Sequence, residues 1–342
     1  MSDFNPNDIG VANGNYFALP YTLEESGIVL VSVPWDVTTS YSAGTSDGPQ
    51  AIIDASVQVD LFDENVPGAW KTRIGTLPVD KNVIKHNKRV RKIAEHVIEE
   101  LASGAEPQTL ARQIEEVNEA SAQINEYVKA VSSEFLRKGK IVGVVGGEHS
   151  VPLGLIKALG EEYGSFGVLH IDAHADLREA YEGFTYSHAS IMYNVLKEVP
   201  AVTRLTQVAV RDFCSEEYAI MTREDGFVRP FTDSFLSRRK FEGETWSRLC
   251  DEIVATLPEQ VYISFDIDGL SPELCPNTGT PVPGGLSFRE ADYLLQKLAA
   301  AGKRIIGFDL CEVAPAREGE WDANVGARVL FKLCLYAGNR VN

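Results

Sequence analysis

The sequence predicts an α/β protein in which helices cover both faces of a mostly parallel β-sheet. From residue 140 onward, strands that are almost entirely apolar alternate with helices, a pattern typical of parallel sheets buried on both faces. Ionisable residues follow directly after four of these strands. Because ligands bind beyond the carboxyl ends of parallel strands, the same pattern predicts where the functional site lies.

The expected elements follow one another along the chain. A first apolar strand spans residues 27–33, and helical periodicity predicts two long helices over residues 85–101 and 110–136. Residues 214–260 are less regular. Further strands are expected over residues 141–146, 166–176, 204–213, 261–270 and 303–313. Further helices are expected over residues 151–163, 187–199, 286–301 and 322–336. Motifs spread along the whole chain favour a single domain over residues 1–342, with an N-terminal extension over about residues 1–26.

The composition favours some classes of binding partner over others and indicates a cellular compartment. The 342 residues include 49 acidic and 32 basic side chains, for a formal net charge of −17. This balance disfavours nucleic acid or an anionic membrane as the main partner, whereas a small cationic substrate, or solubility alone, would fit. The five cysteines form no CxxC pair, and the polar N-terminus lacks the features of a secretory signal, so we expect a cytoplasmic protein.

The residues after the four strands carry the chemistry. His149 follows the strand at 141–146, and the strand at 166 runs into Asp172, His174 and Asp176. Asp266 and Asp268 close the strand at 261, and Asp309 and Glu312 close the strand at 303. On an extended strand, residues two apart share a face, so each set of acids is expected to point to one side.

Several carboxylates in one crevice repel one another unless a cation neutralises them. Four aspartates and two neutral histidines carry a charge of about −4, which matches two divalent cations. This ligand chemistry favours Mn²⁺, while the general affinity order would favour a later metal such as Ni²⁺. Two such ions could lower the pKa of one shared water.

Each motif also has a plain structural interpretation. A GG-x-HS segment can be a tight strand-to-helix turn with Ser150 as N-cap, and D-x-D is common in loops. Three ionisable side chains after one apolar strand are harder to explain without a ligand. His170 lies inside its strand, on the face opposite or below the site, and is expected to be a hydrogen-bonded core histidine.

Together these motifs resemble the ureohydrolase family of arginases, agmatinases and their relatives. The similarity runs from about Gly27 to the C-terminus. Its anchors are GGEHS at 146–150, DAHAD at 172–176, SFDIDGLSPELCPNTGTPVPGGLS at 264–287 and DLCEVAP at 309–315. The resemblance implies a three-layer αβα sandwich, two Mn²⁺ ions per subunit, and hydrolysis of a guanidino compound to urea and an amine. It also implies a homo-oligomer, a trimer or hexamer.

The resemblance implies a role for each matching residue. One metal would be held by His149, Asp172, Asp176 and Asp266. The other would be held by Asp172, His174, Asp266 and Asp268, so that Asp172 and Asp266 bridge. His188 would shuttle protons or help hold the substrate, and Glu312 would pair with the guanidinium. Asp176 would also move the proton from the nucleophile to the leaving amine.

The sequence indicates the substrate less specifically than it indicates the metal ligands and the reaction. The DLR-x-x-YEG-x-x-YSHAS segment is similar to agmatinases, so agmatine, giving putrescine, is expected, with arginine, guanidinobutyrate or guanidine as alternatives. Arg178 stands where arginases have an asparagine, and it could pair with Glu179 or Glu182 or contact substrate. Ser271 replaces the usual aspartate. Two alternatives of another class are a non-catalytic metal-binding relative and a one-zinc deacetylase.

Overall fold

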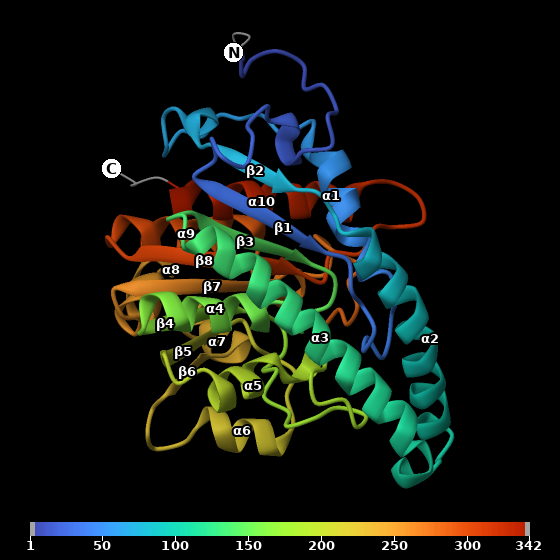
Figure 1. Cartoon of the computed structure of the whole chain (residues 1–342). Helices are drawn as coiled ribbons and strands as arrows, with labels where there is room; N and C mark the ends of the chain where they lie inside the picture. Colours follow the sequence, from blue (N-terminus) through green and yellow to red (C-terminus); the bar gives the residue numbers. More distant parts are fainter. Residues whose placement is uncertain (1–3, 339–342) are drawn as a thin grey trace.

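One sheet organises the molecule, seen in a computed structural model that describes residues 4–338 (Figure 1). Within that part of the chain the sheet has eight strands, all parallel, in the order β2-β1-β3-β8-β7-β4-β5-β6. The strands are β1 (Ile28–Val33), β2 (Ile74–Leu77), β3 (Ile141–Gly146), β4 (Phe166–Ile171), β5 (Val202–Val208), β6 (Val228–Phe231), β7 (Gln260–Asp266) and β8 (Arg304–Cys311). The expected parallel sheet is thus confirmed.

Helices cover both faces of this sheet and make three layers (Figure 1). Alternate residues of β1 enter different cores, Ile28 and Leu30 one, Val29 and Val31 the other. The first core packs under α1 (Gly48–Ser56), α8 (Trp246–Ala255), α9 (Phe288–Ala300) and α10 (Trp321–Gly338). The second packs under α2 (Lys81–Ala102), α3 (Ala111–Leu136), α4 (Leu153–Tyr163) and α5 (Ile191–Glu198). The expected αβα sandwich is confirmed.

The expected elements agree with the structure where their patterns are long. The helix expected over residues 85–101 runs over Lys81–Ala102, because the Asp80 side chain accepts a hydrogen bond from Asn82 N and caps it. The less regular stretch holds α6 (Ser215–Met221), β6, α7 (Asp233–Phe241) and α8. The four-residue strand β6 contains Pro230 and lies at the sheet edge, where proline is tolerated and the strand pattern is weak.

The N-terminal segment packs against the sheet. Tyr16, Phe17 and Leu19 are buried in the core under α1, and the Tyr16 hydroxyl lies 2.7 Å from Ser32 Oγ. The expected extension over residues 1–26 is therefore part of the folded body where it is described, and its residues 1–3 lie outside the described chain. The extent of the domain, 1–342, stays a prediction.

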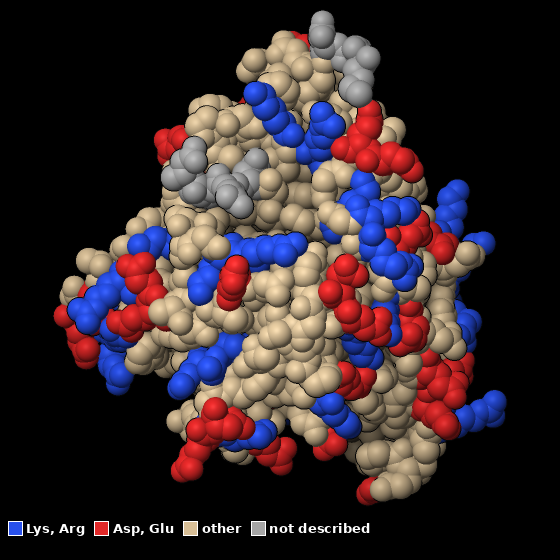
Figure 2. Space-filling model, turned by 60° about the vertical axis from the view of Figure 1, so that its left-hand side comes forward, with Lys and Arg blue, Asp and Glu red and all other residues tan. Residues whose placement is uncertain are grey.

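Charge on the surface is mixed. Figure 2 shows lysine and arginine side chains interspersed with aspartate and glutamate on the face that it presents, with no continuous basic patch among the described residues there. All five cysteines lie within the described chain and are free thiols. Among residues 4–338, none of the helices combines the length and the apolar character needed to cross a membrane.

Glycine allows α3 and α4 to pack closely. A Cβ at Gly154 of α4 would lie 2.2 Å from Asn125 O and 2.7 Å from Lys129 N, both backbone atoms of α3. We expect Gly154→Ala to push the helices apart and to lower the free energy of unfolding by about 2–3 kcal/mol, measured by urea titration. Gly27→Ala, which has open space for its methyl group, is the matched control. Equal stability of the two variants would contradict this.

Candidate metal centre

The residues predicted to form the site come from the four central strands. Strands β3, β8, β7 and β4 are neighbours in the sheet, and their carboxyl ends meet at one edge. His149 follows β3, Asp172 follows β4 and Asp266 ends β7, while Glu312 follows directly after β8. Residues more than 160 positions apart along the chain are thereby brought into contact, as in the hydrogen bond from His149 N to Glu312 Oε1.

One histidine nitrogen lies among three carboxylates. His149 Nδ1 is 3.0 Å from Asp172 Oδ2, 3.2 Å from Asp176 Oδ2 and 3.2 Å from Asp266 Oδ2. The other ring nitrogen, Nε2, lies 2.8 Å from Ser264 Oγ. A single N–H cannot satisfy three buried carboxylates, so the group as a whole is suited to a cation.

A second group shares Asp172 with the first. His174 Nδ1 is 3.0 Å from Asp268 Oδ2 and 3.5 Å from Asp172 Oδ1. Asp268 is buried, and apart from this contact with His174 its Oδ2 has no hydrogen-bond partner in the described chain. Asp172 therefore presents one oxygen to each group, as expected for a bridging residue.

The backbone around these acids differs from the extended strands that the sequence predicted. Strand β4 ends at Ile171, and Asp176 has a φ of 54°, in the left-handed region. Asp268 lies in a 3-10 turn, η6 (Ile267–Gly269), whose Asp268 N donates to Asp266 Oδ1. The prediction of shared faces on extended strands was wrong. The side chains converge because the chain turns after each strand and the acids cap these turns.

Burial and mutual repulsion dominate the titration of the cluster. Burial and the charge of Asp172 raise the pKa of Asp176 to about 6. Burial, with the charges of Asp268 and Asp172, raises the pKa of Asp266 well above its usual range. Burial opposes protonation of His149 and His174, yet the surrounding carboxylates raise the pKa of both rings well above the usual range. The cluster thus needs positive charge, from protons or from metal ions.

The donors fit two divalent cations. Ligand atoms about 2.1 Å from a six-coordinate ion lie about 3 Å apart, which is the spacing around His149 Nδ1. The buried Oδ2 of Asp268, without a hydrogen-bond partner other than His174 within residues 4–338, is also suited to a ligand. Carboxylates with a minority of imidazoles favour ions such as Mn²⁺ over thiolate-preferring metals.

Polar residues behind the cluster orient it. His170 Nε2 lies 2.8 Å from Asp172 Oδ2, and Gln207 Nε2 lies 3.0 Å from His170 Nδ1. His170 is therefore the expected hydrogen-bonded core histidine, but it lies directly below Asp172 rather than on the opposite face. The Tyr262 hydroxyl and Phe265 N both donate to Asp309, which is fully buried beneath the cluster.

Glu312 has one carboxylate oxygen without a hydrogen-bond partner in the described chain, close to the metal groups. Its Oε1 accepts the hydrogen bond from His149 N, while its Oε2 is buried without a partner among the described residues. A Cβ on Gly279 would lie 2.9 Å from Oε2, so only glycine lets the chain approach this oxygen so closely. Burial, with the charges of Glu148 and Asp268, raises the pKa of Glu312 well above its usual range. A cationic group would satisfy this carboxylate.

His188 is held by a residue that the sequence did not single out. His188 N donates to Thr38 Oγ1 at 3.1 Å, and its Nδ1 lies 3.3 Å from the same oxygen. Burial, then the charges of His174 and Arg91, lowers the pKa of His188 to about 3. Thr38 also donates to Glu148 Oε2 through both its amide and its hydroxyl. The Thr-rich loop after β1 was the only signal of this role.

Arg178 has a different partner from the two acids expected. Its Nε lies 3.7 Å from Glu217 Oε2, and its guanidinium lies 5.0 Å from the centre of the Tyr181 ring. Glu217 is fixed because it accepts hydrogen bonds from Leu177 N and Cys214 N. Ser271, in place of the usual aspartate, donates its amide to Leu286 O and begins a turn.

Comparison with known proteins agrees with this geometry. The arginase family matches residues 26–336. The N(1)-aminopropylagmatine ureohydrolase of Synechocystis is 29% identical, covering 92% of this chain and 90% of the relative. An enzyme of the same name from Thermus thermophilus is 31% identical, covering 91% and 89%. Proclavaminate amidino hydrolase from Streptomyces clavuligerus superposes with a TM-score of 0.71 at 22% identity, covering 98% of this chain and all of that structure.

A match over most of the chain, to relatives covered nearly end to end, shows the family. The αβα fold and a cluster of histidines and aspartates able to hold two metal ions agree with it. The chain therefore belongs to the arginase family, and it is a ureohydrolase, a hydrolase of amidine C–N bonds.

Proposed function

We propose that the chain hydrolyses agmatine to putrescine and urea with two Mn²⁺ ions. One observation carries the proposal: a buried carboxylate oxygen of Glu312, without a partner in the described chain, lies beside a cluster that requires cations. That combination suits a guanidinium group held next to an activated water.

The proposed ligands are the two groups described above, with Asp266 added to the second group because the family resemblance implies it. His149, Asp172, Asp176 and Asp266 would hold one ion, and Asp172, His174, Asp266 and Asp268 the other. When bound, two divalent cations lower the pKa of a shared water, so that a nucleophile exists at neutral pH. Mn²⁺ is favoured by the ligand chemistry, with Ni²⁺ as the alternative.

The chain's own residues would handle the substrate and the proton. Glu312 Oε2 accepts hydrogen bonds from the planar guanidinium and fixes its carbon for attack. Asp176 takes up the proton that the attacking water loses and gives it to the leaving nitrogen, so that the C–N bond breaks. The second proton, lost from the hydroxyl group as urea forms, ends on the amine, which leaves as an ammonium ion that carries the positive charge of the guanidinium. His188, kept neutral by its lowered pKa, can hydrogen-bond the substrate.

A second substrate is supported by the relatives. Both curated relatives compared above are named N(1)-aminopropylagmatine ureohydrolases, and that substrate extends agmatine by an aminopropyl group. Arginine is less favoured, because Arg178 is turned onto Glu217 and does not offer the small polar side chain that arginases have there. We further propose a role in cytoplasmic polyamine metabolism, with a small cationic substrate as the main partner, and a trimer or hexamer.

The substrate can be tested with a panel. Urea release should be fastest with agmatine, at least tenfold faster in kcat/KM than with arginine, 4-guanidinobutyrate or guanidine. A higher kcat/KM with N(1)-aminopropylagmatine would favour the second candidate. Faster turnover of arginine would contradict both, and bound metal without urea from any of these compounds would favour a non-catalytic relative.

Metal content tests the proposed ligands. Asp268→Ala removes a carboxylate of the second group, and we expect it to lose at least one ion per chain and to abolish urea release. Purified wild-type protein should hold two ions by elemental analysis, and chelation should lower its melting temperature, because the carboxylates then repel one another. Asp225→Asn, at an exposed aspartate, is the control. One zinc per wild-type chain would indicate the deacetylase alternative.

Glu312→Gln tests recognition of the guanidinium. The amide keeps the shape of the side chain but loses its charge, and we expect kcat/KM for agmatine to fall about 30- to 150-fold with two ions still bound. Glu179→Gln, at an exposed acid of a neighbouring loop, should change kcat/KM less than twofold. An unchanged kcat/KM in Glu312→Gln would show that Glu312 does not hold the substrate.

A further inference from the structure

Helices α2 and α3 hold two loops beside the candidate site. We call residues 34–47 the first loop, which carries Thr38, and residues 177–187 the second loop, which leads into His188. On α3, Asn118 Nδ2 donates to Gly183 O and Asn118 Oδ1 accepts from Thr185 N, so the second loop is fastened to this helix. The two helices lie side by side along one edge of the molecule (Figure 1).

The first loop is fastened to α2 by Arg91. Arg91 Nη1 lies 3.0 Å from Asp36 O, 3.1 Å from Val37 O and 2.5 Å from Thr39 O, and donates to all three carbonyls. The side chain of Arg91 is only 14% exposed, and its Nε pairs with Glu95 at 3.0 Å. A guanidinium facing three carbonyls of one short segment fixes the path of that segment more firmly than a surface ion pair could.

A second contact on the same helix supports the loop. Asn87 Nδ2 donates to Asp36 Oδ1, and Asn87 Oδ1 accepts from Asp36 N. The other oxygen of Asp36 accepts from Gly44 N and Ser46 N. The first loop is thus closed on itself and anchored on α2 at its start.

Thr38, between the carbonyls that Arg91 holds, makes the loop's contact with the site. Its hydroxyl accepts from His188 N and lies 3.3 Å from His188 Nδ1. Thr38 is also held by Glu148 Oε2, which accepts hydrogen bonds from its amide and its hydroxyl. Release of the carbonyls on either side of Thr38 would leave Glu148 as its remaining anchor and would loosen the hydroxyl beside His188, while the metal groups stayed in place.

We propose that Arg91 is a positioning residue of this enzyme, acting through Thr38 on His188. The inference rests on the proposed function for its kinetic test, but the anchoring of the first loop can be measured without activity. The side chain of Arg91 makes its described contacts with Glu95 and the loop backbone. Its charge also helps to lower the pKa of His188, and the coupling to Thr38 and the hydrogen exchange of the loop separate the anchoring from this effect of charge.

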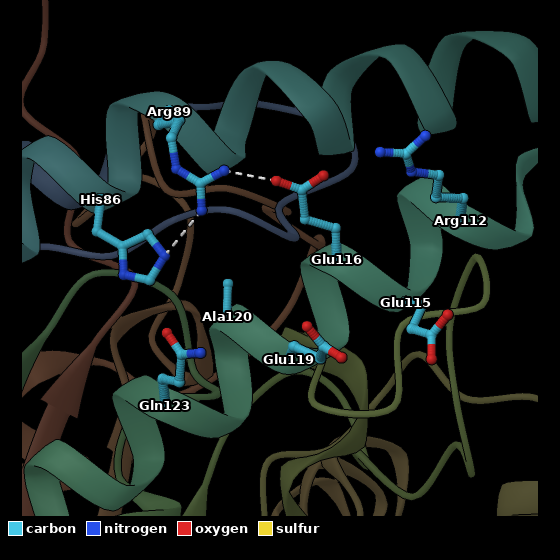
Figure 3. Close-up of a pocket in the computed structure, with 8 residues that line it drawn as sticks. All are labelled: His86, Arg89, Arg112, Glu115, Glu116, Glu119, Ala120 and Gln123. Atoms are coloured by element: carbon cyan, nitrogen blue, oxygen red, sulfur yellow. Dashed lines mark hydrogen bonds and ion pairs between the residues drawn. The ribbon is translucent and has the colours of Figure 1, made fainter.

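Arg89 supplies a matched control. It lies two residues away on α2, is 56% exposed, and pairs with Glu116 of α3 at 2.5 Å beside a surface pocket of about 350 Å³ (Figure 3). His86, also drawn in Figure 3, lies near Arg89 in this pocket. Arg89→Met removes an arginine from the same helix without touching the first loop.

Arg91→Met should lower kcat for agmatine about tenfold or more, change KM less than threefold, and keep two metal ions. Arg89→Met should change kcat less than twofold. Arg91→Lys keeps a cation with three donors and should recover part of the lost kcat. This variant keeps the proposal testable if Arg91→Met fails to fold. Equal kcat values for Arg91→Met and Arg89→Met would overturn the proposal.

Coupling to Thr38 separates positioning from general stability. In a Thr38→Val background, Arg91→Met should lower kcat less than twofold further, since both changes disturb one path. Effects that multiply would overturn the proposal. Amide hydrogen exchange of residues 36–46 should rise at least tenfold in Arg91→Met but not in Arg89→Met. This hydrogen-exchange measurement does not depend on turnover of any guanidino compound. An unchanged exchange rate in Arg91→Met would show that Arg91 does not anchor the first loop.

Discussion

The buried carboxylates at the carboxyl edge of the sheet repel one another, and the residues around them are arranged to accommodate that repulsion. Asp172, Asp176, Asp266 and Asp268 lie within reach of two imidazoles, in a region from which solvent is largely excluded. Such a cluster costs free energy unless positive charge enters it. The polar residues behind it, among them His170 and Asp309, are buried at fixed positions so that this charge can be met by metal ions rather than by rearrangement.

The rigid sheet supplies the acids, whereas loops supply the groups that face the substrate. Glu312 and Asp176 both have a positive φ, a conformation that costs free energy for residues other than glycine. Their neighbours hold them there: Glu312 N donates to Gly147 O, and Tyr193 N donates to Asp176 O. Thr38 and His188 in turn depend on helices outside the sheet. The candidate metal ligands are thus fixed by the sheet, whereas the residues that face the substrate lie on loops that are held in place by other contacts.

The sequence was sufficient to predict the site residues whose side chains are ionisable, because their chemistry follows from their residue type. Acids and histidines after apolar strands indicated both the parallel sheet and the cluster, because few other arrangements bury so many charges. The turns that bring Asp268 and Asp176 inward were not predictable, since they depend on hydrogen bonds such as the one that Asp268 N donates to Asp266 Oδ1. Arg91 and Thr38 were missed because their roles arise from backbone contacts between segments more than 50 residues apart, which no local pattern records. The partner of Arg178 was missed for the same reason.

The order of the strands has a consequence for how the protein is made. Strands β7 and β8 come last along the chain, yet they occupy the centre of the sheet, between β3 and β4. While the chain emerges from the ribosome, β1–β3 and β4–β6 each keep an open edge until β7 and β8 are made. The acids of both metal groups come together only then. A full set of ligands for either metal group therefore exists only after β7 has joined the sheet between β8 and β4.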